Sequence, residues 1–118
     1  MRVAPFEISL RLPFVADHFH DLPGFVEARH GHNWEVEATV RAASPGEETA
    51  LRAALRAWVE AADYRLLNEE QTLSGRNPTA ELLSQWAFES LREAGLDPLR
   101  VRIREKANYW AACESVAP

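Results

Sequence analysis

The sequence predicts an α+β fold in which two helices cover one face of a four-stranded antiparallel sheet. Four segments show the alternation of apolar and polar residues that is typical of half-buried strands. Two further segments carry apolar residues at helical spacing. The order strand, strand, helix, helix, strand, strand suggests that the helices gather on one side of the sheet. We expect strands at residues 6–18, 31–41, 99–105 and 108–116, and helices at residues 47–62 and 77–95.

The composition is that of one globular domain of 118 residues, without a recognisable linker. Apolar residues make up 47% of the chain, which is enough to form a core. The formal net charge of -5 argues against nucleic-acid binding, which normally needs a basic surface. No segment approaches the ~20 apolar residues that span a bilayer, and no signal peptide is recognisable. We therefore expect a cytoplasmic domain spanning residues 1–118, with no nucleic-acid or membrane partner.

The two N-terminal strands each have one apolar face. Even-numbered residues from Phe6 to Ala16 are apolar, whereas several odd-numbered ones are polar or charged. The segment 21–24, with the sequence Asp-Leu-Pro-Gly, predicts a loop. In the second strand the even-numbered residues from Trp34 to Val40 form the apolar face. Both strands are therefore expected to bury their even-numbered side chains.

The second helix has signals at both ends. We expect Asn77 to be its N-cap and Pro78 to lie in its first turn, and we expect Gly95 to end it. In the last strand the alternation is unclear, because the segment 109–113 is apolar throughout. Such a run is typical of an inner surface or a subunit interface. Cys113 lies in this run, and we interpret this single cysteine as a packed core or interface thiol.

Three histidines are expected to meet at one end of the predicted sheet. His30 and His32 are two residues apart, so their side chains leave the same face of a strand. His18 has the parity of the buried residues of the first strand. Three neutral imidazoles with an open fourth position are typical of a catalytic zinc site. The alternative is that they are ordinary polar residues at a sheet edge; His20 is a possible substitute ligand.

Glu105 continues the inward-facing series of the third predicted strand. A carboxylate buried there needs a hydrogen-bond donor, because burying it unpaired costs several kcal/mol. A ring edge with an amino group and a neighbouring ring nitrogen, as in a pterin, would suit it. The alternative is that the strand ends one residue earlier and Glu105 lies in water.

Five short motifs occur together along the chain. They are Ala16-Asp17-His18, His30-Gly31-His32-Asn33-Trp34, Leu67-Asn68, Pro78-Thr79-Ala80-Glu81 and Arg104-Glu105. Together they resemble the family of the 6-pyruvoyl- and 6-carboxy-tetrahydropterin synthases. This resemblance covers nearly the whole chain and implies the tunnelling fold, whose subunits trimerise into a β-barrel and whose trimers commonly stack into a homo-hexamer. It also implies active sites between subunits and 7,8-dihydroneopterin triphosphate as the substrate.

The resemblance also implies roles for individual residues. His18, His30 and His32 match the zinc ligands of the family, and Glu105 matches the glutamate that anchors the pterin ring. Thr79 and Glu81 match the helix-start segment near the pterin pocket.

The usual catalytic set of this family is incomplete here. Family members commonly carry a cysteine four residues before His-Gly-His, where this chain has Val26. Their Asp-His pair is replaced by Asp63-Tyr64. Glu27, however, resembles the glutamate of a variant branch, often called type III, that yields 6-hydroxymethyl-7,8-dihydropterin for folate synthesis. The alternative is that Glu27 is a solvated loop residue.

We therefore expect a zinc-dependent lyase in which Glu27 moves the proton, with Asp63 and Tyr64 as less favoured candidates. Two other hypotheses stay open. One is a 6-pyruvoyl- or 6-carboxy-tetrahydropterin synthase with a rearranged catalytic set, which would serve tetrahydrobiopterin or queuosine synthesis. The other is a non-catalytic pterin-binding homologue.

Overall fold

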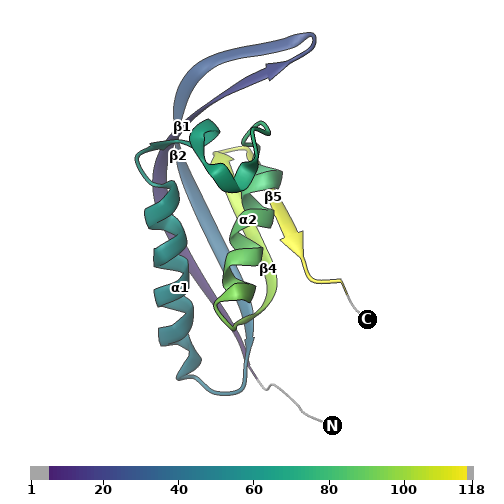
Figure 1. Ribbon diagram of the computed structural model, residues 1–118. Coiled ribbons are helices and arrows are strands. Elements are labelled where there is room, and N and C mark those ends of the chain that lie inside the picture. Colours follow the sequence, from purple (N-terminus) through teal and green to yellow (C-terminus); the bar gives the residue numbers. More distant parts are fainter. Residues whose placement is uncertain (1–5, 117–118) are drawn as a thin grey trace.

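The computed structural model describes residues 6–116 and confirms the predicted α+β class (Figure 1). Two strands precede the first helix and two follow the second helix, as the alternation predicted. Two short 3-10 turns lie between the helices, η1 (Leu67–Glu69) and η2 (Gln71–Leu73). The main elements are β1 (Phe6–Leu22), β2 (Phe25–Ala42), α1 (Glu47–Ala62), β3 (Arg65–Leu66), α2 (Ala80–Glu93), β4 (Asp97–Lys106) and β5 (Tyr109–Glu114).

The sheet has one strand more than predicted, and its order is β3-β1-β2-β4-β5. The additional strand, β3, pairs in parallel with β1 at Ala16 and Asp17, whereas the other neighbours are antiparallel. Alternation could not reveal β3, because two residues are too few to show a period.

The β1–β2 hairpin is longer than predicted. The turn lies within the predicted loop at 21–24, but that loop was predicted too long and the predicted start of the second strand at residue 31 was wrong, since β1 and β2 pair up to Leu22 and Phe25. Only Pro23 and Gly24 form the turn, and Gly24 adopts a φ of 80°, which suits glycine. Apolar alternation fades near the histidines, but an antiparallel ladder needs only backbone groups and so continues. The hairpin arches beyond the helices (Figure 1).

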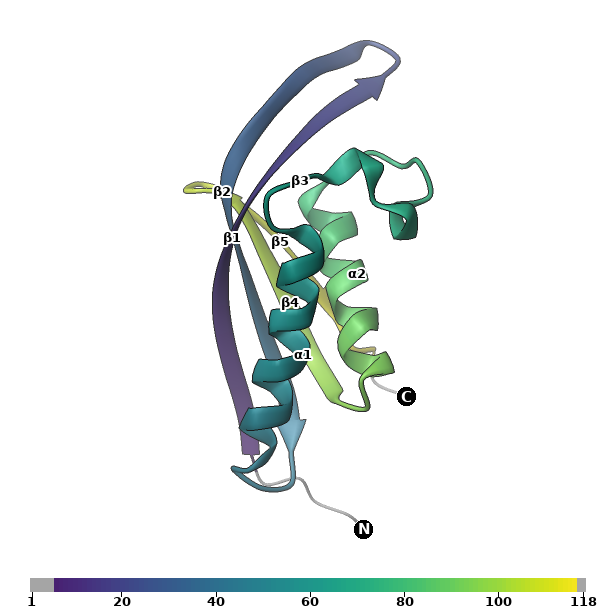
Figure 2. The ribbon, with the colours of Figure 1, turned by 60° about the vertical axis from the view of Figure 1, so that its left-hand side comes forward.

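Both helices lie on one face of the sheet (Figure 2). α1 packs mainly against β1, and α2 packs against β4 and β5. The even-numbered side chains of β1 from Ile8 to Ala16 and of β2 from Trp34 to Val40 lie in or against the core, as predicted, whereas Phe6 is largely exposed. The core includes Phe14, Trp34, Val36, Val40, Leu51, Leu55, Leu83, Leu91, Val101 and Ile103.

The start of α2 differs from the prediction. Thr79, rather than Asn77, is the N-cap, because its hydroxyl accepts a hydrogen bond from the Leu82 amide at 3.1 Å. The Asn77 side chain instead accepts a hydrogen bond from the Asp21 amide at 3.0 Å. The predicted cap therefore fastens the long hairpin to the loop before α2.

The other face of the sheet carries charged side chains in facing pairs. Arg11 lies 3.8 Å from Glu35 and 3.7 Å from Glu37, and Arg104 lies 3.7 Å from Glu35. Arginines of β1 and β4 therefore offset the charge of glutamates on β2, which lies between them. Neither helix, within residues 6–116, is long and apolar enough to cross a membrane.

Candidate metal centre and catalytic site

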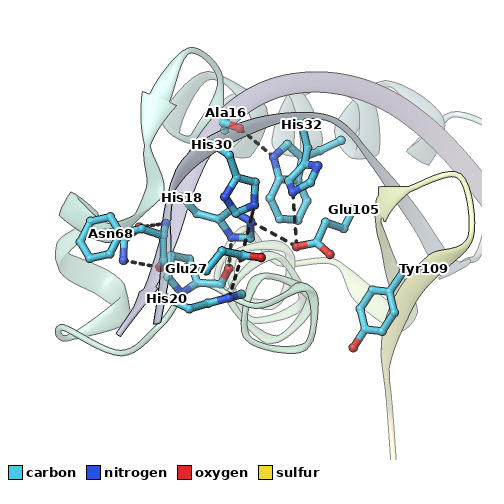
Figure 3. Close-up of polar contacts among 12 residues, drawn as sticks. Ala16, His18, His20, Glu27, His30, His32, Asn68, Glu105 and Tyr109 are labelled. Atoms are coloured by element: carbon cyan, nitrogen blue, oxygen red, sulfur yellow. Dashed lines mark hydrogen bonds and ion pairs between the residues drawn. The ribbon is translucent and has the colours of Figure 1, made fainter. Parts of the chain in front are cut away.

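The three predicted histidines converge in the half of the long hairpin that lies nearer its turn (Figure 3). His18 and His30 are direct partners across β1 and β2, and His32 lies two residues further along β2. One ligand atom from each of the three rings lies within 4.8 Å of those of the other two. The closest pair is His18 Nε2 and His30 Nε2, at 3.0 Å. The predicted convergence of the imidazoles is therefore confirmed.

Backbone carbonyls orient two of the rings. His18 Nδ1 donates to the carbonyl oxygen of Pro78 at 2.8 Å, just before α2. His30 Nδ1 donates to the carbonyl oxygen of Ala28 at 2.8 Å. These bonds fix the tautomer of both rings and leave each Nε2 as the atom with a free lone pair.

The buried rings favour the uncharged form that a metal needs. His18 is fully buried, and burial lowers its pKa below the ordinary value. Burial lowers the pKa of His32 in the same way. Two Nε2 lone pairs 3.0 Å apart repel each other unless a cation lies between them. Ligand nitrogens of tetrahedral zinc are about 3.3 Å apart, so this arrangement fits a divalent metal ion.

Glu105 faces the histidines. It is the extra residue of an irregularity in the β4–β5 ladder, between the pairs Arg104–Trp110 and Lys106–Tyr109. Its side chain is 14% exposed, so it does not lie in open water. The Oε1 atom is 3.3 Å from His18 Nε2 and 3.8 Å from His32 Nε2. The inward direction therefore agrees with the prediction, and the carboxylate lies beside the candidate metal position.

Glu27 joins the same group because of a β-bulge. His18 pairs with His30, but His20 pairs with Glu27, so two residues of β2 oppose Phe19 alone. The extra residue turns Glu27 onto the face that carries the histidines. Its Oε1 atom lies 3.1 Å from His20 Nδ1 and 3.4 Å from His30 Nε2. Glu27 is thus a strand residue beside the imidazoles and not a residue of a solvated loop.

His20 lies next to Glu27 rather than within the trio. Its ring centroid is 4.9 Å from that of His18 and 5.6 Å from that of Phe25. With His18 and Glu27 it forms a second group of possible ligands, again within 4.8 Å. The two groups share His18 and form one polar cluster.

Asn68 holds the hairpin at this cluster. Its side chain accepts a hydrogen bond from the Phe19 amide at 2.9 Å and donates one to the Phe19 carbonyl at 3.0 Å. The bulge therefore lies against the η1 segment. Hydrogen bonds hold it on both sides of Phe19, from Asn68 to the Phe19 backbone and from the His18 ring to the Pro78 carbonyl.

Thr79 and Glu81 lie at the start of α2, and the structure adds Tyr109 as a neighbour. The Tyr109 hydroxyl donates a hydrogen bond to the Glu81 carboxylate. This bond lowers the pKa of Glu81 and raises the pKa of Tyr109. Sequence analysis missed Tyr109, because its position in an apolar run gave no signal of this partner.

Asp63 and Tyr64 lie outside the histidine cluster of their own chain. The Asp63 carboxylate accepts a hydrogen bond from the Val15 amide at 2.8 Å. Tyr64 is 83% exposed and has a φ of 55°. Their catalytic role stays a prediction.

Val26, at the position of the missing cysteine, is exposed near the hairpin turn. Cys113 is half-buried and packs against the core.

Comparison with known proteins agrees with the family resemblance of the sequence motifs. The family model described as 6-pyruvoyl tetrahydropterin synthase matches residues 7–115. A relative from Archaeoglobus fulgidus is 30% identical over 99 residues, which cover 78% of this chain and 83% of the relative. Its name assigns it to the 6-carboxy-5,6,7,8-tetrahydropterin synthases.

Solved structures of similar proteins share the fold. The 6-pyruvoyl tetrahydropterin synthase of Caenorhabditis elegans has a TM-score of 0.79 at 17% identity, covering 98% of this chain and 100% of that chain. A Plasmodium vivax 6-pyruvoyltetrahydropterin synthase, in which a catalytic glutamate is replaced by cysteine, has a TM-score of 0.65 at 12% identity. That match covers 93% of this chain and 98% of the Plasmodium chain.

Proposed function

Since this chain belongs to the 6-pyruvoyl tetrahydropterin synthase family, we propose that it is a zinc-dependent pterin lyase. Its proposed reaction cleaves the side chain of 7,8-dihydroneopterin triphosphate to give 6-hydroxymethyl-7,8-dihydropterin. The observation that carries this proposal is the position of Glu27, whose Oε1 atom lies 3.4 Å from His30 Nε2. A base at that place can reach a substrate hydroxyl held beside the three histidines.

His18, His30 and His32 are the proposed ligands of the zinc ion. Their Nε2 atoms are free, and the lowered pKa values of His18 and His32 favour neutral rings. When bound, zinc would act as a Lewis acid that lowers the pKa of the side-chain hydroxyls of the substrate.

Glu27 is the proposed general base. Its carboxylate would take the proton from the hydroxyl on the second side-chain carbon of the substrate. The bond between the first and second side-chain carbons then breaks, and its electron pair moves into the pterin ring system. The first carbon gains a proton, and the triphosphate fragment leaves as an aldehyde. A Plasmodium vivax 6-pyruvoyltetrahydropterin synthase whose replaced glutamate is described as a catalytic residue supports a catalytic glutamate in this chain.

Glu105 is proposed to hold the pterin ring. It is largely enclosed, and a carboxylate pairs well with two adjacent N–H groups of a ring edge. Thr79 and Glu81 lie at the nearby start of α2 and are proposed to border the pterin pocket. These contacts would fix the ring so that its side chain reaches Glu27 and the histidines.

A second candidate function is 6-carboxytetrahydropterin synthesis. The Archaeoglobus relative, which carries that name, favours this candidate. In that reaction Asp63 or Tyr64 of a neighbouring subunit would be candidates to move a proton, in addition to Glu27. A homologue that binds pterin without turnover is the remaining alternative.

We also propose a homo-hexamer made of two stacked trimers. Within residues 6–116, β3 covers the outer edge of β1 only at Ala16 and Asp17, so the edge from Phe6 to Pro13 has no strand partner on that side. β5 forms the opposite edge of the sheet. Pairing of these edges between subunits would satisfy their backbone groups. Sedimentation of the purified protein tests this proposal, and a monomer at micromolar concentration would contradict it.

The deciding experiment incubates the zinc-loaded protein with 7,8-dihydroneopterin triphosphate and identifies the products. Hydroxymethyl-dihydropterin is expected, whereas a carboxy or pyruvoyl product would favour the second candidate. Glu27→Gln should keep zinc and pterin binding but lose turnover, and Glu60→Gln on the exposed side of α1 is the matched control. Binding without any product would refute the lyase.

The metal assignment has a separate test. His30→Ala should lose bound zinc, as measured by elemental analysis of the purified protein, because it removes a ligand whose lone pair faces His18 Nε2. A full zinc content in that variant would refute the ligand set.

A further inference from the structure

We propose that His20 is a positioning residue that holds Glu27 beside the metal as a free base and prevents it from becoming a metal ligand. This inference rests on the proposed function, from which the metal ion and the role of Glu27 as base are taken. Its main test, however, does not need turnover. It is carried by the geometry of the bulge, the burial of His20 and the position of the Glu27 carboxylate between two imidazoles.

The bulge makes His20 and Glu27 a direct cross-strand pair. Because two residues of β2 oppose Phe19, the side chains of His20 and Glu27 leave the same face of the hairpin. His20 Nδ1 lies 3.1 Å from Glu27 Oε1, and the close-up view shows the carboxylate lying among these rings (Figure 3). Without the bulge Glu27 would point to the opposite face, so this contact exists only because of it.

Glu27 Oε1 lies between two competing partners. It is 3.4 Å from His30 Nε2 and 3.1 Å from His20 Nδ1. Ligand atoms of a tetrahedral zinc ion are about 3.3 Å from one another, so this oxygen is as far from His30 as a fourth ligand would be. A carboxylate bound to the metal would have its lone pair occupied and would be a poor base. A hydrogen bond from His20 Nδ1, 3.1 Å away, would compete for the same oxygen.

His20 is suited to this role by its burial. Its side chain is only 15% exposed. Neither of its ring nitrogens has a correctly aligned hydrogen-bond partner within residues 6–116, although Nδ1 is within reach of the carboxylate. A buried polar nitrogen without a partner is unfavourable, so a small rotation of the Glu27 carboxylate toward Nδ1 is stabilising. The ring of Phe25 lies beside His20 and limits other orientations of the imidazole.

The test replaces zinc by Co²⁺ and measures the visible absorption spectrum, whose bands shift when a carboxylate oxygen replaces water at the fourth ligand position. In His20→Ala we expect shifted bands with unchanged metal stoichiometry, because Glu27 then binds the metal. The double variant His20→Ala/Glu27→Gln should restore the parent spectrum. His20→Asn should also retain it, since the asparagine amide can donate from nearly the position of Nδ1. Asp21→Asn, an exposed neighbour on β1, is the matched control.

Kinetics give a second readout. His20→Ala should lower kcat by about 10–100-fold, as is typical when an outer residue of a metal site is lost, while KM stays unchanged. His20→Asn should recover most of kcat. If the Co²⁺ spectrum of His20→Ala is the same as that of the parent protein, the proposal is overturned. It is also overturned if the spectral change persists in His20→Ala/Glu27→Gln. If the parent shows no turnover, the lyase assignment fails, but the cobalt spectra still decide the role of His20.

Discussion

Trp34 connects the hydrophobic core with the histidine cluster, so Trp34→Phe should affect both. Trp34 is 1% exposed, and its ring stacks on Phe14 with centroids 5.8 Å apart. Its Nε1 donates to the Ala16 carbonyl at 3.0 Å. The same ring lies against the rings of His18 and His32, at centroid distances of 5.1 and 5.4 Å.

The expected loss of stability has two parts. Losing a buried hydrogen bond lowers the free energy of unfolding by about 1 kcal/mol. The smaller ring leaves roughly 40 Å³ unfilled, which costs about 1 kcal/mol more at ~24 cal/mol per Å³. Lost burial of ring atoms adds to this, so we expect a decrease of about 2–3 kcal/mol. For a domain of this size that corresponds to a Tm lower by about 8–12 °C.

Trp58→Phe is the matched control, because it removes the same ring volume without a hydrogen bond. Trp58 is 3% exposed, and its Nε1 has no hydrogen-bond partner within residues 6–116. Its ring packs edge-on against Phe14, at 5.3 Å between centroids. The free energy of unfolding should therefore decrease by only about 1–2 kcal/mol in this variant, because unfilled volume and lost burial remain but no hydrogen bond is broken.

The assay is urea denaturation of the zinc-free proteins, followed by far-ultraviolet circular dichroism at one fixed protein concentration. Competition with a chelator then compares the zinc affinity of the two variants with that of the parent. Zinc affinity should fall by about tenfold in Trp34→Phe, since the ring supports two ligands, and should not change in Trp58→Phe. Equal losses of stability in the two variants, or equal zinc affinities, would refute this reasoning.

Two further predictions concern the helix cap and pH. Thr79→Ala should lower the free energy of unfolding by about 1 kcal/mol in a denaturant titration, because the Leu82 amide loses its cap, whereas Thr79→Ser should be near the parent. Burial lowers the pKa of His18 and His32 below 6.5, so below that pH the unfolded chain binds more protons than the folded chain. The Tm of the zinc-free protein should therefore fall as the pH decreases from 6.5 toward 5, and less steeply in His32→Gln. A Tm that is independent of pH over this range would contradict the second prediction.

Most of the sheet could be predicted because side chains of a regular strand alternate between its faces. Alternation placed Phe14, Trp34 and Val36 in the core and His18, His30 and His32 on the same face. It did not reveal how far the two strands extend toward the turn, because the histidines interrupt the apolar pattern while backbone pairing continues. The N-cap of α2 was predicted at Asn77 and lies at Thr79; asparagine and threonine both suit that position, so residue type alone did not locate it.

The sequence by itself therefore determined the fold class and the convergence of three imidazoles, because both follow from a period of two along β1 and β2. Only the tertiary structure decided which carboxylates join them. Glu27 reaches the cluster through a bulge, and a bulge depends on how two strands pair and not on the residues of one strand. Glu105 and the Pro78 carbonyl come from distant segments that meet His18 only when β4 and α2 pack against the hairpin.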